Sequence, residues 1–233
     1  MKVLAVGAHP DDIEILCAGT LAKCAARGDQ LHIVVVTDGA AGHKVIPPPQ
    51  LAEIRKREAS AAAALIGAQI AFLAEPDELL FEDERTRLMM IDALRVADPD
   101  LIITHGPEDY HPDHVHCSRL VFGASFVSSV PNIKTDHPAQ EKIAALYYMD
   151  ALAGAGFLPE EYVDITETFA TKRDMLSQHQ SQLTWLKEHD NIDILEFVET
   201  VAHFRGLQCG VQYAEGFRAA HLWPRQKTQR LLP

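Results

Sequence analysis

The sequence opens with the stretch Lys2-Val3-Leu4-Ala5-Val6-Gly7-Ala8-His9-Pro10-Asp11-Asp12-Ile13-Glu14, which decides the fold. Its first six residues form an apolar run that predicts a buried strand. The residues from Ile13 to about Ala26 have helical spacing, and we expect this helix to end at Gly28. A histidine and two adjacent carboxylates therefore lie where a strand is followed by a helix. In open α/β sheets, this carboxyl end of a strand is where ligands bind.

The same alternation of strand and helix continues along the chain. Apolar runs predict further strands at 31–36, 69–73, 101–104 and 143–149. Between and after them, helices are predicted at 51–66, after an extended connector at 47–49, at 84–97, from Pro112 or Asp113 onward, at 165–188 and at 194–206. This order predicts right-handed βαβ units, and hence an α/β protein with a parallel core sheet and helices on both faces. No repeat or linker divides the chain, so we expect a single domain over 1–233.

Composition excludes several classes of protein. The chain has 233 residues, a hydrophobic content of 47% and a net charge of -12. This acidic balance, without any run of Lys or Arg, argues against nucleic acid or an anionic membrane as partner. No apolar segment approaches the length of a membrane span, and the chain starts directly with a strand, so we expect a soluble, cytoplasmic protein. The cysteines lack C-x-x-C spacing and are expected to be buried free thiols: Cys17, Cys24, Cys117 and Cys209.

A second polar cluster follows the predicted strand 101–104. The segment from His105 to His116 is the part of the chain that is richest in His and Asp. A helix that starts at Pro112 or Asp113 would place His111 and His114 about one turn apart. Either cluster alone could be a solvated turn or a set of helix caps. Two such clusters at the same edge of a sheet favour a functional site instead.

The residue types in the two clusters suit a catalytic metal. Catalytic zinc has three protein ligands and leaves a fourth position for water, and His9, Asp12 and His114 meet that count. Neighbouring side chains in a turn point in different directions, so Asp11 would face the zinc-bound water as general base. His111 would stabilise the oxyanion or protonate the leaving amine, if a carboxylate such as Asp113 keeps it cationic. We expect the other histidines to be structural or exposed, although His105 and His116 flank the second cluster and could support the ligands from behind.

The chain resembles the PIG-L or LmbE-like metal-dependent deacetylases. The matching segments span most of the chain: Ala8-His9-Pro10-Asp11-Asp12 with Glu14, Thr37-Asp38-Gly39 with Gly42, Arg55-x-x-Glu58, His111-Pro112-Asp113-His114, His179-x-Ser181-Gln182 and Ala214-Glu215-Gly216-Phe217. The resemblance implies a Rossmann-like three-layer α/β/α sandwich and zinc-dependent removal of acetyl from an N-acetylated amino sugar.

The resemblance also implies roles for single residues. It makes His9, Asp12 and His114 the zinc ligands, Asp11 the general base, His111 and Asp113 the groups that act on the oxyanion and leaving amine, and Arg55 a contact to the sugar. It further implies a homo-oligomer, a trimer or a hexamer. Ile13 stands between Asp12 and Glu14, whereas in the eukaryotic branch the glutamate follows directly, which favours a bacterial branch over a lipid-linked substrate.

Two other functions stay open at this point. A metal-dependent hydratase of an unsaturated dicarboxylate could use the same scaffold. The relatives of that kind lack an intact first motif, which is the segment Ala8-His9-Pro10-Asp11-Asp12 with Glu14, and this chain keeps all of it. A non-catalytic sugar-binding or nucleotide-binding module is the other, although the first turn lacks the G-x-G-x-x-G that lets backbone approach a pyrophosphate. The substrate itself depends on the loops 47–50, 75–81 and 130–140, and the residue types do not separate zinc from iron or manganese.

Overall fold

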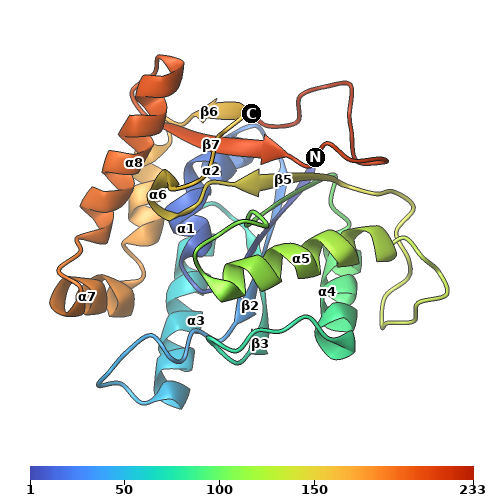
Figure 1. Ribbon diagram of the computed structural model, residues 1–233, viewed down its shortest axis with the longest axis horizontal. Helices are drawn as coiled ribbons and strands as arrows, with labels where there is room; N and C mark the ends of the chain where they lie inside the picture. The colour runs from blue at the N-terminus through green and yellow to red at the C-terminus, as the bar shows by residue number, and fades with distance from the viewer.

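The structure is a computed structural model that describes residues 1–233. Its centre is a seven-stranded sheet with the strand order β3-β2-β1-β4-β5-β7-β6 (Figure 1). The strands are β1 (Lys2–Gly7), β2 (Gln30–Thr37), β3 (Gln69–Glu75), β4 (Leu101–Thr104), β5 (Ala145–Met149), β6 (Glu161–Asp164) and β7 (Ala214–Ala219). Strands β1 to β5 pair in parallel, and β7 is antiparallel to both of its neighbours. The predicted parallel core is confirmed, with an antiparallel extension at one end.

Helices cover both faces of the sheet (Figure 1). They are α1 (Asp12–Leu16), α2 (Ala18–Ala26), α3 (Pro48–Ala64), α4 (Glu84–Ala97), α5 (Pro112–Val127), α6 (Phe169–Leu176), α7 (Gln180–His189) and α8 (Ile194–Cys209), with a short 3-10 turn at Leu152–Gly154. Alternate side chains of β1 enter two separate cores. Val3 and Ala5 pack with α1, α2, α6 and α8, whereas Leu4 and Val6 pack with α4 and α5. The fold is thus a three-layer α/β arrangement, as predicted.

The topology places the two polar clusters together. β1 and β4 are neighbours in the sheet, and Val6 at the end of β1 lies opposite Thr104 at the end of β4. Because the two strands are parallel, the loops that leave them start at the same edge. The side chain of Thr104 also donates a hydrogen bond to the carbonyl of Val6 (3.0 Å), which ties the two strand ends together.

The predicted continuous helix over 13–26 is wrong. The chain breaks at Cys17, whose φ of -146° is not helical, and the segment forms α1 and α2 instead. The carboxylate of Glu215 accepts hydrogen bonds from the backbone N–H groups of Gly19 (3.0 Å) and Thr20 (2.7 Å) at the start of α2. A distant side chain therefore supplies the acceptor that a new helix start requires.

Three further expectations need correction. The predicted helix over 165–188 is two helices, α6 and α7, separated around His179, whose side chain is fully buried. Pro48 and Pro49 are not an extended connector but the first residues of α3, because proline is favoured in the first turn of a helix. Strands β6 and β7 had no counterpart among the predicted strands. All four cysteines are free, but Cys209 is exposed rather than buried. No helix of the protein has both the length and the apolar character needed to cross a membrane.

Candidate active site

Asp11 occupies an unusual backbone conformation in the loop that follows β1. Its φ is 139°, a region that side-chain-bearing residues rarely adopt. The guanidinium of Arg55, from α3, stabilises this loop by donating to the carbonyl of Pro10 (2.9 Å) and to that of Gly39 (2.9 Å). Its Nη2 also lies 3.2 Å from Oδ1 of Asp11. Such strained positions persist where surrounding structure enforces them, and they concentrate at functional sites.

Asp12 points in a different direction from Asp11 and contacts a group of imidazoles. Its Oδ1 lies 3.2 Å from Nε2 of His114, and its Oδ2 lies 3.4 Å from Nδ1 of His9. Oδ2 also accepts a hydrogen bond from the backbone N–H of His9 (2.7 Å). The structure therefore brings the predicted ligands His9, Asp12 and His114 together, with Asp12 between the two imidazoles.

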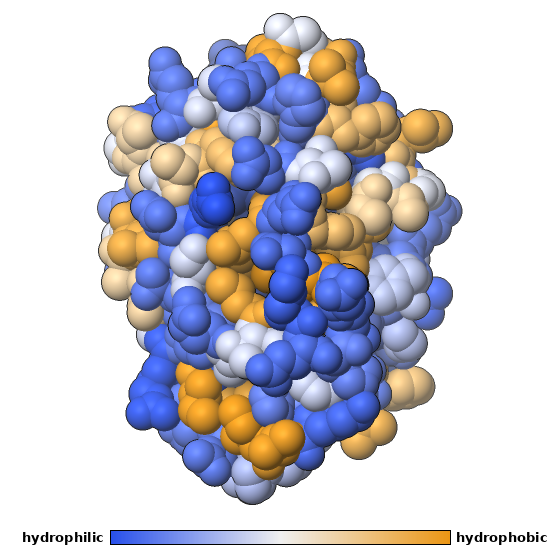
Figure 2. Space-filling view, turned by 90° about the vertical axis from the view of Figure 1, so that its left-hand side faces the viewer, coloured by the Kyte–Doolittle hydropathy of each residue, from blue (hydrophilic) through white to orange (hydrophobic).

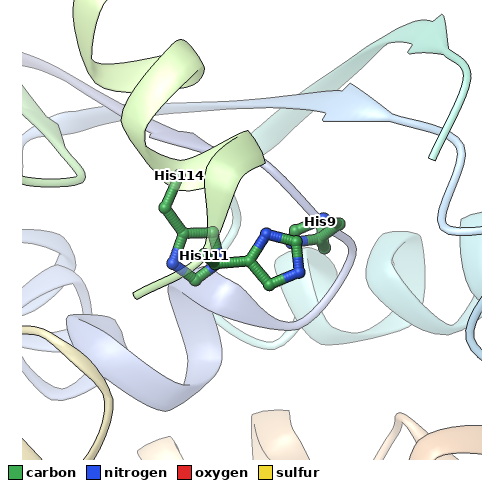
Figure 3. A group of neighbouring side chains, drawn as sticks. All are labelled: His9, His111 and His114. Atoms are coloured by element: carbon green, nitrogen blue, oxygen red, sulfur yellow. The ribbon is translucent and has the colours of Figure 1, made fainter. Parts of the chain in front are cut away.

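Two histidines of the second polar cluster lie at the start of α5. His111 is the residue before the helix and His114 lies in its first turn, so the two rings stack with their centroids 4.7 Å apart. The ring of His9, from the loop after β1, lies 4.6 Å from that of His111 and 5.3 Å from that of His114, centroid to centroid. Figure 3 shows the three rings side by side.

Several combinations of these groups could hold a metal ion. Ligand atoms within 4.8 Å of one another are found in three sets: His9 with His111 and His114, Asp12 with His105 and His114, and His9 with Asp77 and Asp113. His105 is a poor candidate because its Nε2 already accepts the backbone N–H of Ala8 (3.0 Å), which occupies the lone pair that a metal would need. No single set holds all three predicted ligands, but each of them belongs to at least one.

The electrostatics of the site favour a bound cation. Burial by itself would lower the pKa of His9, but Asp12, Asp113 and Asp77 raise it to about 10. Burial likewise opposes the charge on His114, yet Asp12 and Asp109 raise its pKa to about 9. The carboxylates thus hold protons on imidazoles that are themselves buried. A divalent cation would replace those protons, because metal ligation requires the neutral imidazole.

Asp11 has the environment of a proton acceptor. Burial raises the pKa of its carboxyl, and Arg55 opposes this rise. Burial acts in the same direction on Asp12, but His114, His105 and His9 hold the pKa of that carboxyl well below its usual range. One of the two neighbours is therefore kept as an anion, while the other takes up a proton more readily. The two carboxyl groups thus have different environments, and their roles as general base and metal ligand stay predictions.

His111 differs from its sequence-based expectation. Burial, His9 and His114 lower the pKa of His111, and the upward effects of Glu78 and Asp113 are smaller. Its Nδ1 accepts the backbone N–H of Asp113 (3.2 Å), which places the ring hydrogen on Nε2. The carboxylate of Asp113 faces His9 instead, with Oδ2 3.3 Å from Nε2. These contacts favour a neutral His111 that donates from Nε2, rather than a cation held by Asp113.

Sequence reasoning missed three carboxylates of the site. Oδ1 of Asp77 lies 3.3 Å from Nε2 of His9, and Oε1 of Glu78 lies 3.4 Å from Nε2 of His111. Oδ1 of Asp109 lies 3.1 Å from Nδ1 of His114, the position from which a carboxylate orients a metal-binding histidine. Asp77 and Glu78 belong to the acidic loop after β3, and only the topology, which places β3 two strands from β1, brings them near His9.

The candidate site opens into a cavity of about 260 Å³. Its polar part includes Asp11, Asp12, the histidines His9, His111 and His114, and also Asp77, Glu78, Tyr110 and Gln182. Arg55 also borders the cavity, but its side chain is buried and committed to the loop carbonyls described above. The rest of the lining is largely apolar and comes from α1, α7 and the segment that begins α8.

Fold and site together define an α/β protein with a histidine and aspartate cluster, suited to a metal ion, at the carboxyl edge of its parallel sheet. The family model for GlcNAc-PI de-N-acetylase (PIG-L) matches residues 4–125, just over half of the chain. The chain belongs to this family. The matched segment contains both polar clusters and the helix α3 that carries Arg55.

Individual relatives support this assignment. The chain is 26% identical to the diacetylchitobiose deacetylase of Thermococcus kodakarensis over 93% of its own length and 82% of the relative. The structure of N,N'-diacetylchitobiose deacetylase from Pyrococcus horikoshii is similar, with 28% identity, a TM-score of 0.82 and coverage of 93% of this chain and 82% of that one. The 4-carboxy-2-hydroxymuconate hydratase of Pseudomonas putida has the same fold, with a TM-score of 0.84, 23% identity and coverage of 99% and 100%.

Proposed function

We propose that the protein is a metal-dependent hydrolase that removes the acetyl group from an N-acetylated amino sugar or N-acetylglucosaminyl conjugate, releasing acetate and a free amine. The observation that carries the proposal is the divergence of two adjacent carboxylates. Asp12 contacts the imidazoles of His9 and His114, whereas Asp11 faces the same cavity without being part of that cluster. The two deacetylases that resemble the chain are named for N-acetylated sugars, which supports the substrate class.

We propose zinc as the ion, held by His9, Asp12 and His114, because imidazole and carboxylate ligands are usual for catalytic zinc. A divalent cation there polarises the amide carbonyl and lowers the pKa of water. The raised pKa values of His9 and His114 support this assignment, since they show that the site stabilises positive charge. Iron or manganese would fit the same donors, and metal analysis distinguishes them.

Different residues of the chain then carry out proton transfer, stabilisation of the oxyanion and positioning. Asp11 accepts the proton of the attacking water, for which its raised pKa and its place on the cavity wall are suitable. His111 donates a hydrogen bond from Nε2 to the oxyanion. The proton that Asp11 has taken from the water then passes to the departing amine, which restores the carboxylate. Asp113, in the first turn of α5, holds the loop after β3 in place. Its carboxylate accepts hydrogen bonds from the backbone N–H groups of Glu78 (2.9 Å) and Leu80 (3.2 Å).

Arg55 has a positioning role in this proposal. Its contacts with Pro10, Gly39 and Asp11 keep the general base at its strained backbone angle. A contact between Arg55 and the sugar, which the family resemblance implies, stays a prediction. So do the cytoplasmic location and the trimeric or hexameric assembly.

The test combines metal analysis with an acetate-release screen over N-acetylglucosamine conjugates. We expect about one equivalent of a divalent transition metal per chain, which fits a site with three protein ligands. We also expect acetate release that stops when the metal is removed by a chelator and returns when zinc is added. A protein that binds the metal but releases no acetate from any conjugate would contradict the proposal.

A hydratase of an unsaturated dicarboxylate is the second candidate, since the Pseudomonas putida hydratase shares the whole fold. Loss of the absorbance of an enol or alkene substrate, without release of acetate, would favour it. The intact first motif of this chain, with both Asp11 and Asp12, favours the deacetylase.

A further inference from the structure

The part of the cavity away from the metal cluster is apolar. Ile15 and Leu16 come from α1, Leu186 from α7, and Ile192, Ile194 and Phe197 from the start of α8. Two polar groups of the cavity are already committed, because Arg55 donates to carbonyls of its own chain and Oδ2 of Asp77 accepts the N–H of Ala41 (2.8 Å). Glu78, Tyr110 and Gln182 also line the cavity and could bind sugar hydroxyls. Along the apolar part, a group rich in hydroxyls would lose hydrogen bonds to water without replacing them, which is unfavourable.

The apolar lining continues out of the cavity onto the surface of α8. Ile192 and Phe197 border both the cavity and a second hollow of about 560 Å³, which we call the α8 groove. Ala153, Thr200, Val201 and Phe204 line the rest of it, with the carboxylates of Asp193 and Glu196 at its border. Phe204 is 47% exposed and Ile192 is 38% exposed. Figure 2 looks onto the side of the molecule that carries α7 and α8, where apolar residues gather in patches between hydrophilic ones.

The charges around the α8 groove favour binding of uncharged groups over anionic ones. The charged residues that line it, Asp193 and Glu196, are acidic, although Asp193 pairs with Lys187 (3.6 Å), and the whole chain carries a net charge of -12. An anionic lipid headgroup or phosphate would be repelled. An uncharged alkyl or aryl group would instead remove exposed apolar surface from water, which is favourable.

We infer that the substrate is an N-acetylated amino sugar whose aglycone is uncharged and apolar, and that this aglycone runs from the cavity past Phe197 into the α8 groove. The inference rests on the proposed function and adds the class of substrate to it. Phe204 and Val201 are then specificity-determining residues at the far end of the site.

The experiment uses the zinc-loaded full chain and N-acetylglucosamine β-glycosides with methyl, butyl and octyl aglycones, below their micelle concentrations. Acetate release gives kcat/KM for each substrate. A fully buried methylene increases binding about fourfold, and in a half-open groove we expect about twofold for each added carbon. The octyl glycoside, with seven more carbons, should thus exceed the methyl glycoside by about a hundredfold. Equal kcat/KM along the series would overturn the inference while leaving the deacetylase in place.

A matched pair of variants locates the effect. Phe204→Asp places a charge in the α8 groove, and we expect the octyl-to-methyl ratio of kcat/KM to fall at least fivefold. Leu207→Asp, one turn further along α8 and outside the groove, should leave that ratio unchanged. An equal ratio in both variants and the parent would contradict the inference. Circular dichroism establishes that both variants are folded.

A binding measurement separates failure of the inference from failure of the proposed function. Calorimetry with Asp11→Ala should show that the octyl glycoside binds more tightly than the methyl glycoside, whether or not the parent protein turns either over. Light scattering of the parent and of Phe204→Asp tests the competing occupant, a second copy of the chain. An oligomer that dissociates in the variant, with no change in the octyl-to-methyl ratio, would overturn the inference and make the groove an interface.

Discussion

Asp11 and Asp12 are neighbours in the chain, yet their carboxyl groups have opposite surroundings. Asp12 lies among imidazoles that keep it ionised, whereas burial raises the pKa of Asp11, and Arg55, His179 and His9 oppose this rise only in part. The pair can serve two functions because the φ of 139° at Asp11 turns its side chain away from that of its neighbour. Sequence reasoning predicted this divergence from the geometry of a turn, but not the strained angle that produces it.

Replacing either carboxylate should stop the reaction for a different reason. In Asp12→Asn, loss of a ligand should lower metal content and activity together. In Asp11→Asn, metal content should stay normal while kcat falls by about a hundredfold to ten-thousandfold, the usual contribution of a general base. Elemental analysis and acetate release measure the two quantities. Asp174→Asn, exposed on α6, serves as the control and should change neither. Loss of metal in Asp11→Asn would contradict the assignment.

Arg55 offers a second test at the level of a single residue. Its guanidinium spans two carbonyls and a carboxylate, a fork that lysine cannot reproduce. We expect Arg55→Lys and Arg55→Gln to lower kcat by about tenfold to a hundredfold, because a misplaced base costs rate. KM should change by less than about twofold, since ground-state binding is not affected. A large rise in KM with normal kcat would show instead that Arg55 binds the sugar.

At the scale of elements, the break between α1 and α2 depends on a contact that spans the chain. The carboxylate of Glu215, from β7, caps α2 and pairs with the buried ammonium of Lys172, from α6, whose Nζ also donates to the carbonyl of Ile15 (2.8 Å). This network joins four elements, β7, α2, α6 and α1, and α1 begins at Asp12. It therefore supports the candidate site although it does not line the cavity.

Removing one partner of this buried ion pair should be costly. Glu215→Ala leaves the ammonium of Lys172 without its counterion, and we expect a loss of about 3–5 kcal/mol in the free energy of unfolding. Denaturant unfolding monitored by circular dichroism measures it. Lys187→Ala removes an exposed pair with Asp193 and should cost less than about 1 kcal/mol. Similar losses in the two variants would mean that the buried pair has no special role.

Local patterns predicted some elements well and others poorly, for physical reasons. α4 matches its predicted bounds of 84–97, because a capping box at Asp83 and Thr86 starts the helix within its own sequence. The helix breaks at Cys17 and near His179 depend on Glu215 and on the burial of His179, which no local window contains. The candidate metal cluster was predictable because both of the segments that form it follow strands. The carboxylates of Asp77 and Glu78 were not, since their place depends on the order of strands in the sheet.

At the scale of the whole molecule, a metal ion would join parts of the chain that are about a hundred residues apart. The proposed ligands come from the loop after β1 and from the start of α5, and the sheet between these segments belongs to both cores. The carboxylates around the cluster repel one another unless positive charge is present, so a bound ion would neutralise them as well as link the two segments. Metal binding should therefore stabilise the native protein as a unit.

Removing the metal should lower the melting temperature measurably. A ligand at a hundred times its Kd stabilises the native state by about 2.7 kcal/mol. For a chain of this size, each kcal/mol shifts the melting temperature by about 2–4 °C, so we expect a fall of about 5 to 10 °C in excess chelator. Differential scanning fluorimetry, with and without chelator and after zinc is restored, measures this shift. Asp12→Asn, which lacks a ligand, should melt at the same temperature in all three conditions. A shift of normal size in that variant would mean that the stabilising ion binds elsewhere.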